Sequence, residues 1–227
     1  MTISTNTEAL NATALATRAI HAGQEPDPTT GAVVTPIYMT STFKQDGVGG
    51  LRNGYDYSRS INPTRNSFDE QLAAVEGANY ALSFASGLAA IDVLLRATLK
   101  PGDNILLGND VYGGTYRLLS KVFVPWGIGL DVVDITDTAA VSAALSQNAV
   151  PVHLGGNPVE SAAHITDIAA TSAVAHAHST KWWWTTPSHP RYCSIRCRMA
   201  PTWSYIPPPN TSADIPTWSA ELWCSTT

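Results

Sequence analysis

The feature that most constrains this chain is the uneven distribution of its glycine, phenylalanine and leucine residues. All sixteen glycines lie at or before Gly156, all four phenylalanines lie at or before Phe123, and the only leucine after Leu154 is Leu222. Six of the seven tryptophans, all three cysteines and seven of the fifteen prolines follow Lys181. A segment with one leucine, no phenylalanine and no glycine cannot build an ordinary core or its turns. One uniform globular domain over all 227 residues is therefore excluded.

Charge and hydropathy exclude several classes of protein. The net charge of −5, with 14% charged residues, gives no basic footprint for nucleic acid. No apolar run reaches the roughly 18 residues that a transmembrane helix needs, so we expect no membrane span. The first residues, MTISTNTEAL, lack a basic segment followed by an apolar core. We therefore expect no secretory signal and a cytoplasmic protein.

Helices and strands are expected to alternate from Asn66 onward, whereas residues 1–60 are mixed and polar with a helical pattern only around 7–21. Alternation at this spacing is typical of an α/β fold with a mainly parallel sheet. The expected helices are 67–77 (ending at Gly77), one beginning after Ser86, 115–124, 139–145 and 164–178, and the expected strands are 79–84, 104–108 and 129–135.

We divide the chain on this basis into three parts. Residues 1–65 are predicted to form an N-terminal arm, residues 66–181 a partial α/β large domain, and residues 182–227 an irregular tail. In parallel α/β sheets ligands bind beyond the carboxyl ends of the strands. The loops that follow the expected strands are therefore the first places to look for a binding site.

The segment SFASGLAA (83–90) joins an expected strand to an expected helix. Free N–H groups in the first helical turn, together with the helix dipole, suit a phosphate group. Gly87 permits a close approach of the backbone, Ser86 adds a hydroxyl, and Leu88 completes the turn. The alternative is a plain capped helix with a tight turn.

Two further segments contain candidate binding residues. In DVYGGTYR (110–117), Tyr112 follows a strand and could stack on a flat ligand, or it is simply a half-buried tyrosine beside a flexible turn. In YDYSRSINPTR (55–65), Tyr57 and Arg59 would point the same way on an extended strand and could grip a phosphate. Arg65 lies in the same segment, whose alternative interpretation is a solvated loop.

Taken together, YSRxxNPTR, SGLAA and DVYGGT, in this order and spacing, closely resemble the Cys/Met-metabolism family of pyridoxal-phosphate enzymes. The resemblance includes TRAIHAGQEPDPTTGAVVTPIYMTSTF (17–43) and covers residues 15–150. It implies an N-terminal arm followed by an aminotransferase-like (fold type I) large domain, which this chain contains incompletely. It also implies pyridoxal 5'-phosphate as the cofactor and no metal.

The resemblance assigns roles to the candidate residues. Tyr57 and Arg59 would reach the cofactor phosphate of a neighbouring subunit, and the backbone amides of the turn at 86–88 would hold the same phosphate. Tyr112 would stack on the pyridine ring and assist proton transfer. At Ile61 the family usually has glycine, so strain in a tight turn is expected there.

The resemblance also implies a reaction. The branch of the family that this chain resembles most would join an activated homoserine ester to cysteine by γ-replacement. Other members of the family catalyse elimination reactions and share the same motifs. The substrates are small amino acids, and the shared site implies a homodimer, usually paired into a tetramer.

Two groups that this chemistry requires are missing. The family carries a Schiff-base lysine in HSTTKYIGGHSD and an aspartate for the pyridinium nitrogen in DNTFASP. Neither string is present, and the four lysines, Lys44, Lys100, Lys121 and Lys181, lie in other contexts. A non-catalytic, poorly soluble remnant is therefore a second hypothesis for the chain as written.

The genetic code provides an explanation for the tail. Because tryptophan has the single codon TGG, WWWT read one base back must give Val-Val-Asp, and WWWTTPSHP can then give VVVDNTFAS. The same shift permits HSTTKYIGGHSDVVGGALV for residues 205–224, with the lysine spanning Pro209 and Asn210. The opposite shift permits ETPSNPL for GNPVESAA (156–163). We hypothesise base insertions or deletions near 150–156, 162–164 and 181, from sequencing error or gene decay.

The remaining alternative is a genuine Trp/Pro-rich tail that binds a partner. Three consecutive prolines at 207–209 favour polyproline structure. A zinc site at Cys193 and Cys197 with His189 has only weak support, because no second pair at matching spacing exists. The frame hypothesis accounts for the same residues.

Overall fold

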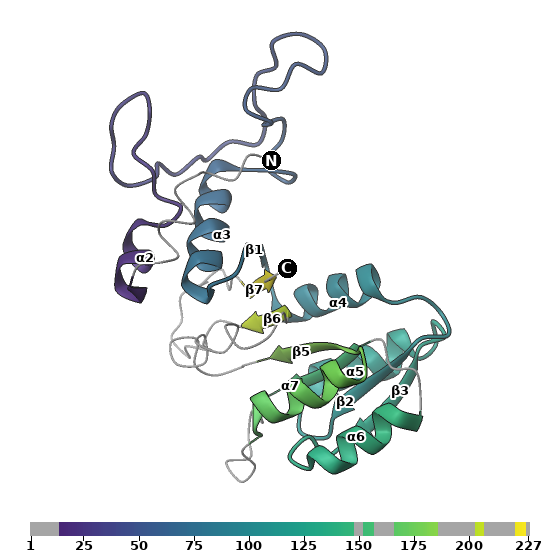
Figure 1. Ribbon diagram of the computed structural model, residues 1–227. Helices are drawn as coiled ribbons and strands as arrows, with labels where there is room; N and C mark the ends of the chain where they lie inside the picture. Colours follow the sequence, from purple (N-terminus) through teal and green to yellow (C-terminus); the bar gives the residue numbers. More distant parts are fainter. Residues whose placement is uncertain (1–13, 148–151, 157–165, 186–202, 207–220, 226–227) are drawn as a thin grey trace. The chain divides into compact units, whose positions relative to one another are not determined.

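The chain falls into two units, Met1–Ala81 and Leu82–Thr227. The computed structural model describes residues 14–147, 152–156, 166–185, 203–206 and 221–225 (Figure 1). None of the described helices combines the length and the apolarity that crossing a bilayer would require.

The first unit has two helices connected by a long loop-rich segment. Helix α2, Leu15–His21, lies where a helical pattern was predicted, and residues 7–13 of that prediction lie outside the described residues. Between the helices the strand-like pairing is limited to isolated bridges, such as the one that joins Thr42 to Tyr57. An arm with little regular structure is therefore what the described residues form before α3, Pro63–Glu76.

Local signals explain both ends of α3. Asn62 is the N-cap, because its side chain accepts a hydrogen bond from the Thr64 amide at 2.9 Å, and Pro63 occupies the first helical position. Gly77 ends the helix in the left-handed conformation, with φ of 69°. The predicted end at Gly77 is confirmed, and the helix begins four residues earlier than predicted because of the Asn-Pro start.

The second unit contains a seven-stranded sheet in the order β1-β7-β6-β5-β4-β2-β3. Strand β2 pairs in parallel with β3 and with β4, β4 pairs in parallel with β5, and β5 with β6. Strand β7 pairs antiparallel with β6. The predicted mainly parallel α/β sheet is confirmed. The strands are β1 Tyr80–Phe84 (which spans the division between the units), β2 Asn104–Gly108, β3 Gly129–Val133, β4 Val152–Gly156, β5 Lys181–Thr185, β6 Trp203–Ile206 and β7 Glu221–Ser225.

Helices cover both faces of this sheet (Figure 1). Strand β2 is buried on both sides, because Ile105 and Leu107 pack into one core cluster and Leu106 packs into the other. The first cluster contains residues of α4 and η1, and the second contains residues of α6 and α7. The helices are α4 Gly87–Thr98, α5 Gly113–Leu118, the π-helix η1 Leu119–Phe123, α6 Thr138–Gln147 and α7 Ile168–Ala177.

The structure differs from the sequence-based expectations in two places. The helix expected over 115–124 is split into α5 and the π-helical turn η1. Beyond residue 181, where an irregular tail was expected, three segments form β5, β6 and β7. Each of these three strands contains tryptophan, and aromatic residues favour strands.

Candidate functional site

The N-terminus of α4 is the best-formed anion site among the predicted positions. Ser86 is the N-cap, with extended backbone (φ −162°, ψ 156°), and its hydroxyl accepts a hydrogen bond from the Ala89 amide at 3.2 Å. The amides of Gly87 and Leu88 precede the first amide that the cap satisfies, so they are available to an anion. Gly87 is buried, whereas Ser86 and Leu88 are exposed. The predicted cap is confirmed.

Tyr112 lies at the start of the next helix, α5, after strand β2. Its side chain is 53% exposed, so the aromatic face is accessible to a ligand. The backbone carbonyl of Tyr112 accepts hydrogen bonds from Thr115 at 2.8 Å and Tyr116 at 3.3 Å, which fixes its main chain. Helices α4 and α5 contact each other, so Tyr112 and the α4 N-terminus belong to neighbouring elements.

Tyr57 and Arg59 lie in the first unit and form a pair. The Arg59 guanidinium carbon lies 5.1 Å from the centroid of the Tyr57 ring, a cation–π geometry. Of the two alternatives that the sequence left open for this segment, the loop is the one observed. The amides of Ser60 and Ile61 donate to the Tyr57 carbonyl, so the backbone turns directly after Tyr57. The two side chains nevertheless lie together, because the guanidinium packs on the ring.

Arg65 has a role that the sequence did not reveal. Its guanidinium donates to the backbone carbonyls of Ser58 at 3.2 Å, Arg59 at 3.4 Å and Ser60 at 2.7 Å. Three carbonyls that converge on one guanidinium hold the 58–60 turn in place. Arg65, within helix α3, therefore positions the loop that carries Arg59. This role depends on the geometry of the folded turn, so the sequence alone could not predict it.

Ile61 causes no strain in this loop. The non-glycine residues with positive φ in the described chain are Asn53 and Ser179, so Ile61 has ordinary backbone geometry. The strain expected from the departure at Ile61 is therefore absent. The Arg65 clamp and the Asn62 cap define the loop without a glycine at that position.

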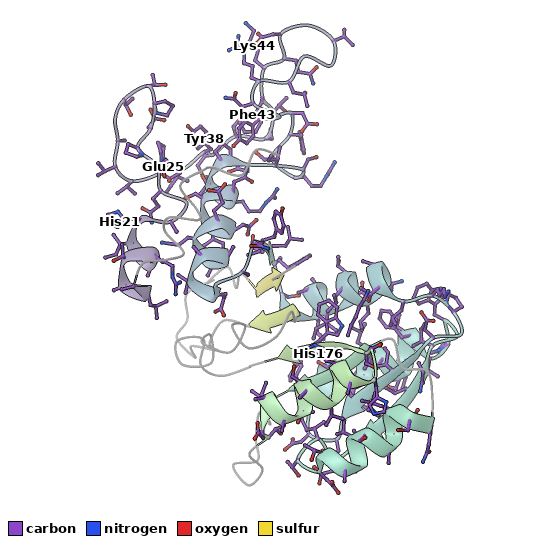
Figure 2. All side chains as sticks on the ribbon, viewed as in Figure 1. His21, Glu25, Tyr38, Phe43, Lys44 and His176 are labelled. Carbon is purple, nitrogen blue, oxygen red and sulfur yellow. The ribbon has the colours of Figure 1, made fainter. Side chains whose placement is uncertain are left out.

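The four lysines belong to other segments of the chain than the predicted site residues. Lys44 belongs to the loop-rich part of the first unit (Figure 2). In the second unit, Lys100 follows the end of α4, about 18 Å along the helix from its N-terminus. Lys121 is in η1. Lys181 is the first residue of β5 and therefore lies at the amino end of that strand. None of the described lysines is adjacent to the α4 N-terminus in the sequence, and none lies in the first turn of α4.

The site residues divide between the two units. Tyr57 and Arg59 belong to the first, and Ser86, Gly87, Leu88 and Tyr112 belong to the second. Within the described residues, no cluster of three or more histidine, cysteine or carboxylate side chains could hold a metal. The possible zinc ligands Cys193, Cys197 and His189 lie outside the described residues.

The sheet order, the helices on both faces and the neighbouring solved structures define the class of this protein: its large domain has the fold of the fold type I pyridoxal-phosphate enzymes. The sequence profile described as "Cys/Met metabolism PLP-dependent enzyme" matches residues 16–183. The chain belongs to this family, whose cofactor is pyridoxal 5'-phosphate.

Individual relatives refine the comparison. Cystathionine gamma-synthase of Mycobacterium tuberculosis is 52% identical over 156 residues, which cover 68% of this chain and 40% of the relative. Cystathionine beta-lyase of Lactococcus lactis is 42% identical over 166 residues, covering 73% and 43%. The crystal structure of metB from Corynebacterium glutamicum has a TM-score of 0.86 at 36% identity, covering 96% of this chain and 56% of that one. The chain thus spans roughly two fifths to just over half of the relatives' length.

The residues present fit the family's cofactor in part. The amides at the start of α4 suit its phosphate, and the exposed Tyr112 ring offers a face to its pyridine ring. The covalent link needs an amine, and none of the four lysines belongs to the segments that carry these residues. The arrangement is suited to holding the cofactor without a covalent bond.

Proposed function

We propose that this chain derives from an enzyme of the cystathionine gamma-synthase type and is inactive as written. The parent enzyme replaces the acyloxy group at the γ-carbon of an activated homoserine ester with the thiol sulfur of cysteine. The single observation that carries the second half of this proposal is the sequence context of the lysines: none of the four belongs to the segments that begin α4 or α5, and none lies in the family's Schiff-base segment. Bound pyridoxal phosphate supplies the electron sink that the γ-replacement needs.

The chain's own residues contribute binding and orientation. The free amides of Gly87 and Leu88 bind phosphate, and the Ser86 hydroxyl lies at the same turn. The exposed Tyr112 ring would stack on the cofactor ring. Arg59 would offset part of the charge of a phosphate bound by a second copy of the chain, and the Tyr57 hydroxyl would donate a hydrogen bond to it, so the intact enzyme is at least a dimer.

We propose that the missing lysine and aspartate are encoded one base back. From Lys181 to Cys224 the shifted frame has no obligatory stop codon. Some residues of the shifted frame are the same whichever synonymous codons are used. The bases for Trp182–Trp184 encode two valines, those for Trp184–Thr185 an aspartate, those for Met199–Ala200 a glycine and those for Trp223–Cys224 a valine. Glycine and valine are the kinds of residue that a sheet and its turns require and that the tail lacks.

The fold supports the position of the shifted aspartate. Strand β5 is a central strand, parallel to β4 on one side and to β6 on the other. The shifted aspartate spans the codons of Trp184 and Thr185, the last residues of this strand. Cofactors of open α/β sheets bind beyond the carboxyl ends of the strands, so this is the end at which a partner for the cofactor nitrogen is needed.

Elimination is a second candidate reaction. The 42% identity to a cystathionine beta-lyase favours it to a lesser degree than the 52% identity to a cystathionine gamma-synthase favours replacement. Both reactions use the same phosphate and ring contacts. The difference therefore depends on substrate-binding residues rather than on the candidate site.

Two chains test the proposal: the chain as written and a chain expressed with the shifted frame restored. After incubation with pyridoxal phosphate, we expect a lysine-linked absorbance band and γ-replacement activity from the restored chain alone. The restored chain with its shifted lysine replaced by alanine is the matched control and should lose both signals. A borohydride-sensitive band on the chain as written, with the label on one of its four lysines, would contradict the proposal.

A further inference from the structure

Gly114 lies close to the ring of Tyr112. A Cβ atom built at Gly114 would lie 3.0 Å from Cδ1 and 3.1 Å from Cζ of that ring, and closer still to Cε1. Real Cβ atoms do not make contacts this short, so a side chain at 114 requires a movement. The three heavy atoms nearest to this Cβ position all belong to the Tyr112 ring.

The ring is the part that would move. The main chain of Tyr112 is fixed by the hydrogen bonds from Thr115 and Tyr116, and Gly114 is itself buried. Tyr112 is 53% exposed, so the residue borders solvent. Rotation about the Tyr112 side-chain torsions therefore relieves the contact at lower cost than a shift of the α5 backbone.

The adjacent glycine provides the contrast. A Cβ atom built at Gly113 meets no heavy atom within 4 Å. Neither Gly113 nor Gly114 has a positive φ, so alanine is compatible with the backbone at both positions. Both residues lie in α5, where alanine favours helix formation over glycine by about 1 kcal/mol. The two positions thus differ chiefly in what their side chains would contact.

We propose that Gly114 is a positioning residue: the absence of its side chain sets the orientation of the Tyr112 ring. Gly113 does not share this role. For cofactor binding the inference rests on the proposed function, in which the Tyr112 face packs on the pyridine ring. A ring displaced by a methyl group at 114 loses that alignment while the α4 phosphate site stays intact.

Fluorine NMR of the full chain labelled with 3-fluorotyrosine tests the ring position without a ligand. The Tyr112→Phe variant identifies the Tyr112 resonance by its loss. We expect Gly114→Ala to shift that resonance and Gly113→Ala to leave it in place, with similar thermal midpoints for the two variants. Equal shifts in both variants, or no shift in Gly114→Ala, would overturn the inference.

Binding of pyridoxine 5'-phosphate tests the consequence, because this probe has no aldehyde and needs no lysine. An aromatic stacking contact is worth about 0.5–1.5 kcal/mol, so Gly114→Ala should weaken binding by about twofold to tenfold and Gly113→Ala should not. In a Tyr112→Ala background, Gly114→Ala should have no further effect. The same loss in that background would overturn the role through Tyr112. Failure of the unmodified chain to bind the probe would count against the proposed function, and the NMR experiment would still decide the inference.

Discussion

Glu76, the last residue of α3, carries an unusual carboxyl group. It is 5% exposed, and its Oε2 atom has no hydrogen-bond partner among the described residues. Burial raises the pKa of Glu76 to about 8. A carboxyl group in such surroundings retains its proton at neutral pH, because the charged form is poorly solvated there.

This raised pKa determines how stability depends on pH. In the unfolded chain Glu76 ionises near its ordinary pKa of 4.5, whereas the folded chain keeps the proton up to about pH 8. The folded state therefore binds more protons in this window, and its free energy of unfolding falls as pH rises, by at most about 1.4 kcal/mol per pH unit. Urea denaturation at a series of pH values between roughly 5 and 8 measures this slope, and Glu76→Gln should remove it. The exposed Glu25→Gln serves as the control, and an unchanged slope in Glu76→Gln would show that the carboxyl group ionises normally.

At the scale of elements, the loop from Tyr57 to Pro63 shows how one helix organises the segment before it. Asn62 begins α3, and Arg65, inside the same helix, holds three carbonyl groups of the preceding turn. The loop that carries Arg59 is therefore fixed by contacts from its own downstream helix. Lysine could not reproduce this, because it is a point charge without the planar fork of donors.

Arg65→Lys should loosen the 58–60 turn. A hydrogen bond to a charged group contributes about 1.5–3 kcal/mol, so loss of the better ones should speed amide exchange at Ser60 and Ile61 by about tenfold or more. Hydrogen exchange followed by mass spectrometry measures this. Arg59→Lys is the matched control, because the Arg59 side chain packs on Tyr57 instead of holding the turn. Equal exchange in Arg65→Lys and the unmodified chain would refute the clamp.

Elements with local signals were predictable from the sequence. The cap at Ser86, the glycine end of α3 at Gly77 and the apolar strand β2 depend on residues within one turn or one strand. The turn after Tyr57 and the π-helical η1 were not predictable, because backbone hydrogen bonds and packing decide them. For the site, the sequence correctly predicted Ser86 as a helix cap. The closeness of Gly114 to the Tyr112 ring could be found only in the three-dimensional structure.

At the scale of the whole molecule, the sheet order carries information that composition could not. Composition separated the tail from the rest, yet β5, β6 and β7 from that tail lie between β4 and β1 in the sheet. Strand pairing over such distances is non-local, so no sequence window contains it. The family match from residue 16 to 183 ends among the tryptophans of β5, where the proposed frame shift begins.

The nucleotide sequence of the codons for residues 181–224 is the most direct test of the central claim. We predict the codon AAG for Lys181 and the codon CCA for each of Pro207, Pro208 and Pro209. Only then does the shifted frame read Thr-Thr-Lys across these prolines and Asn210. Any other proline codon at 209 would give glutamine, glutamate or a stop in place of the lysine, and would contradict the claim that this chain is a frame-shifted enzyme.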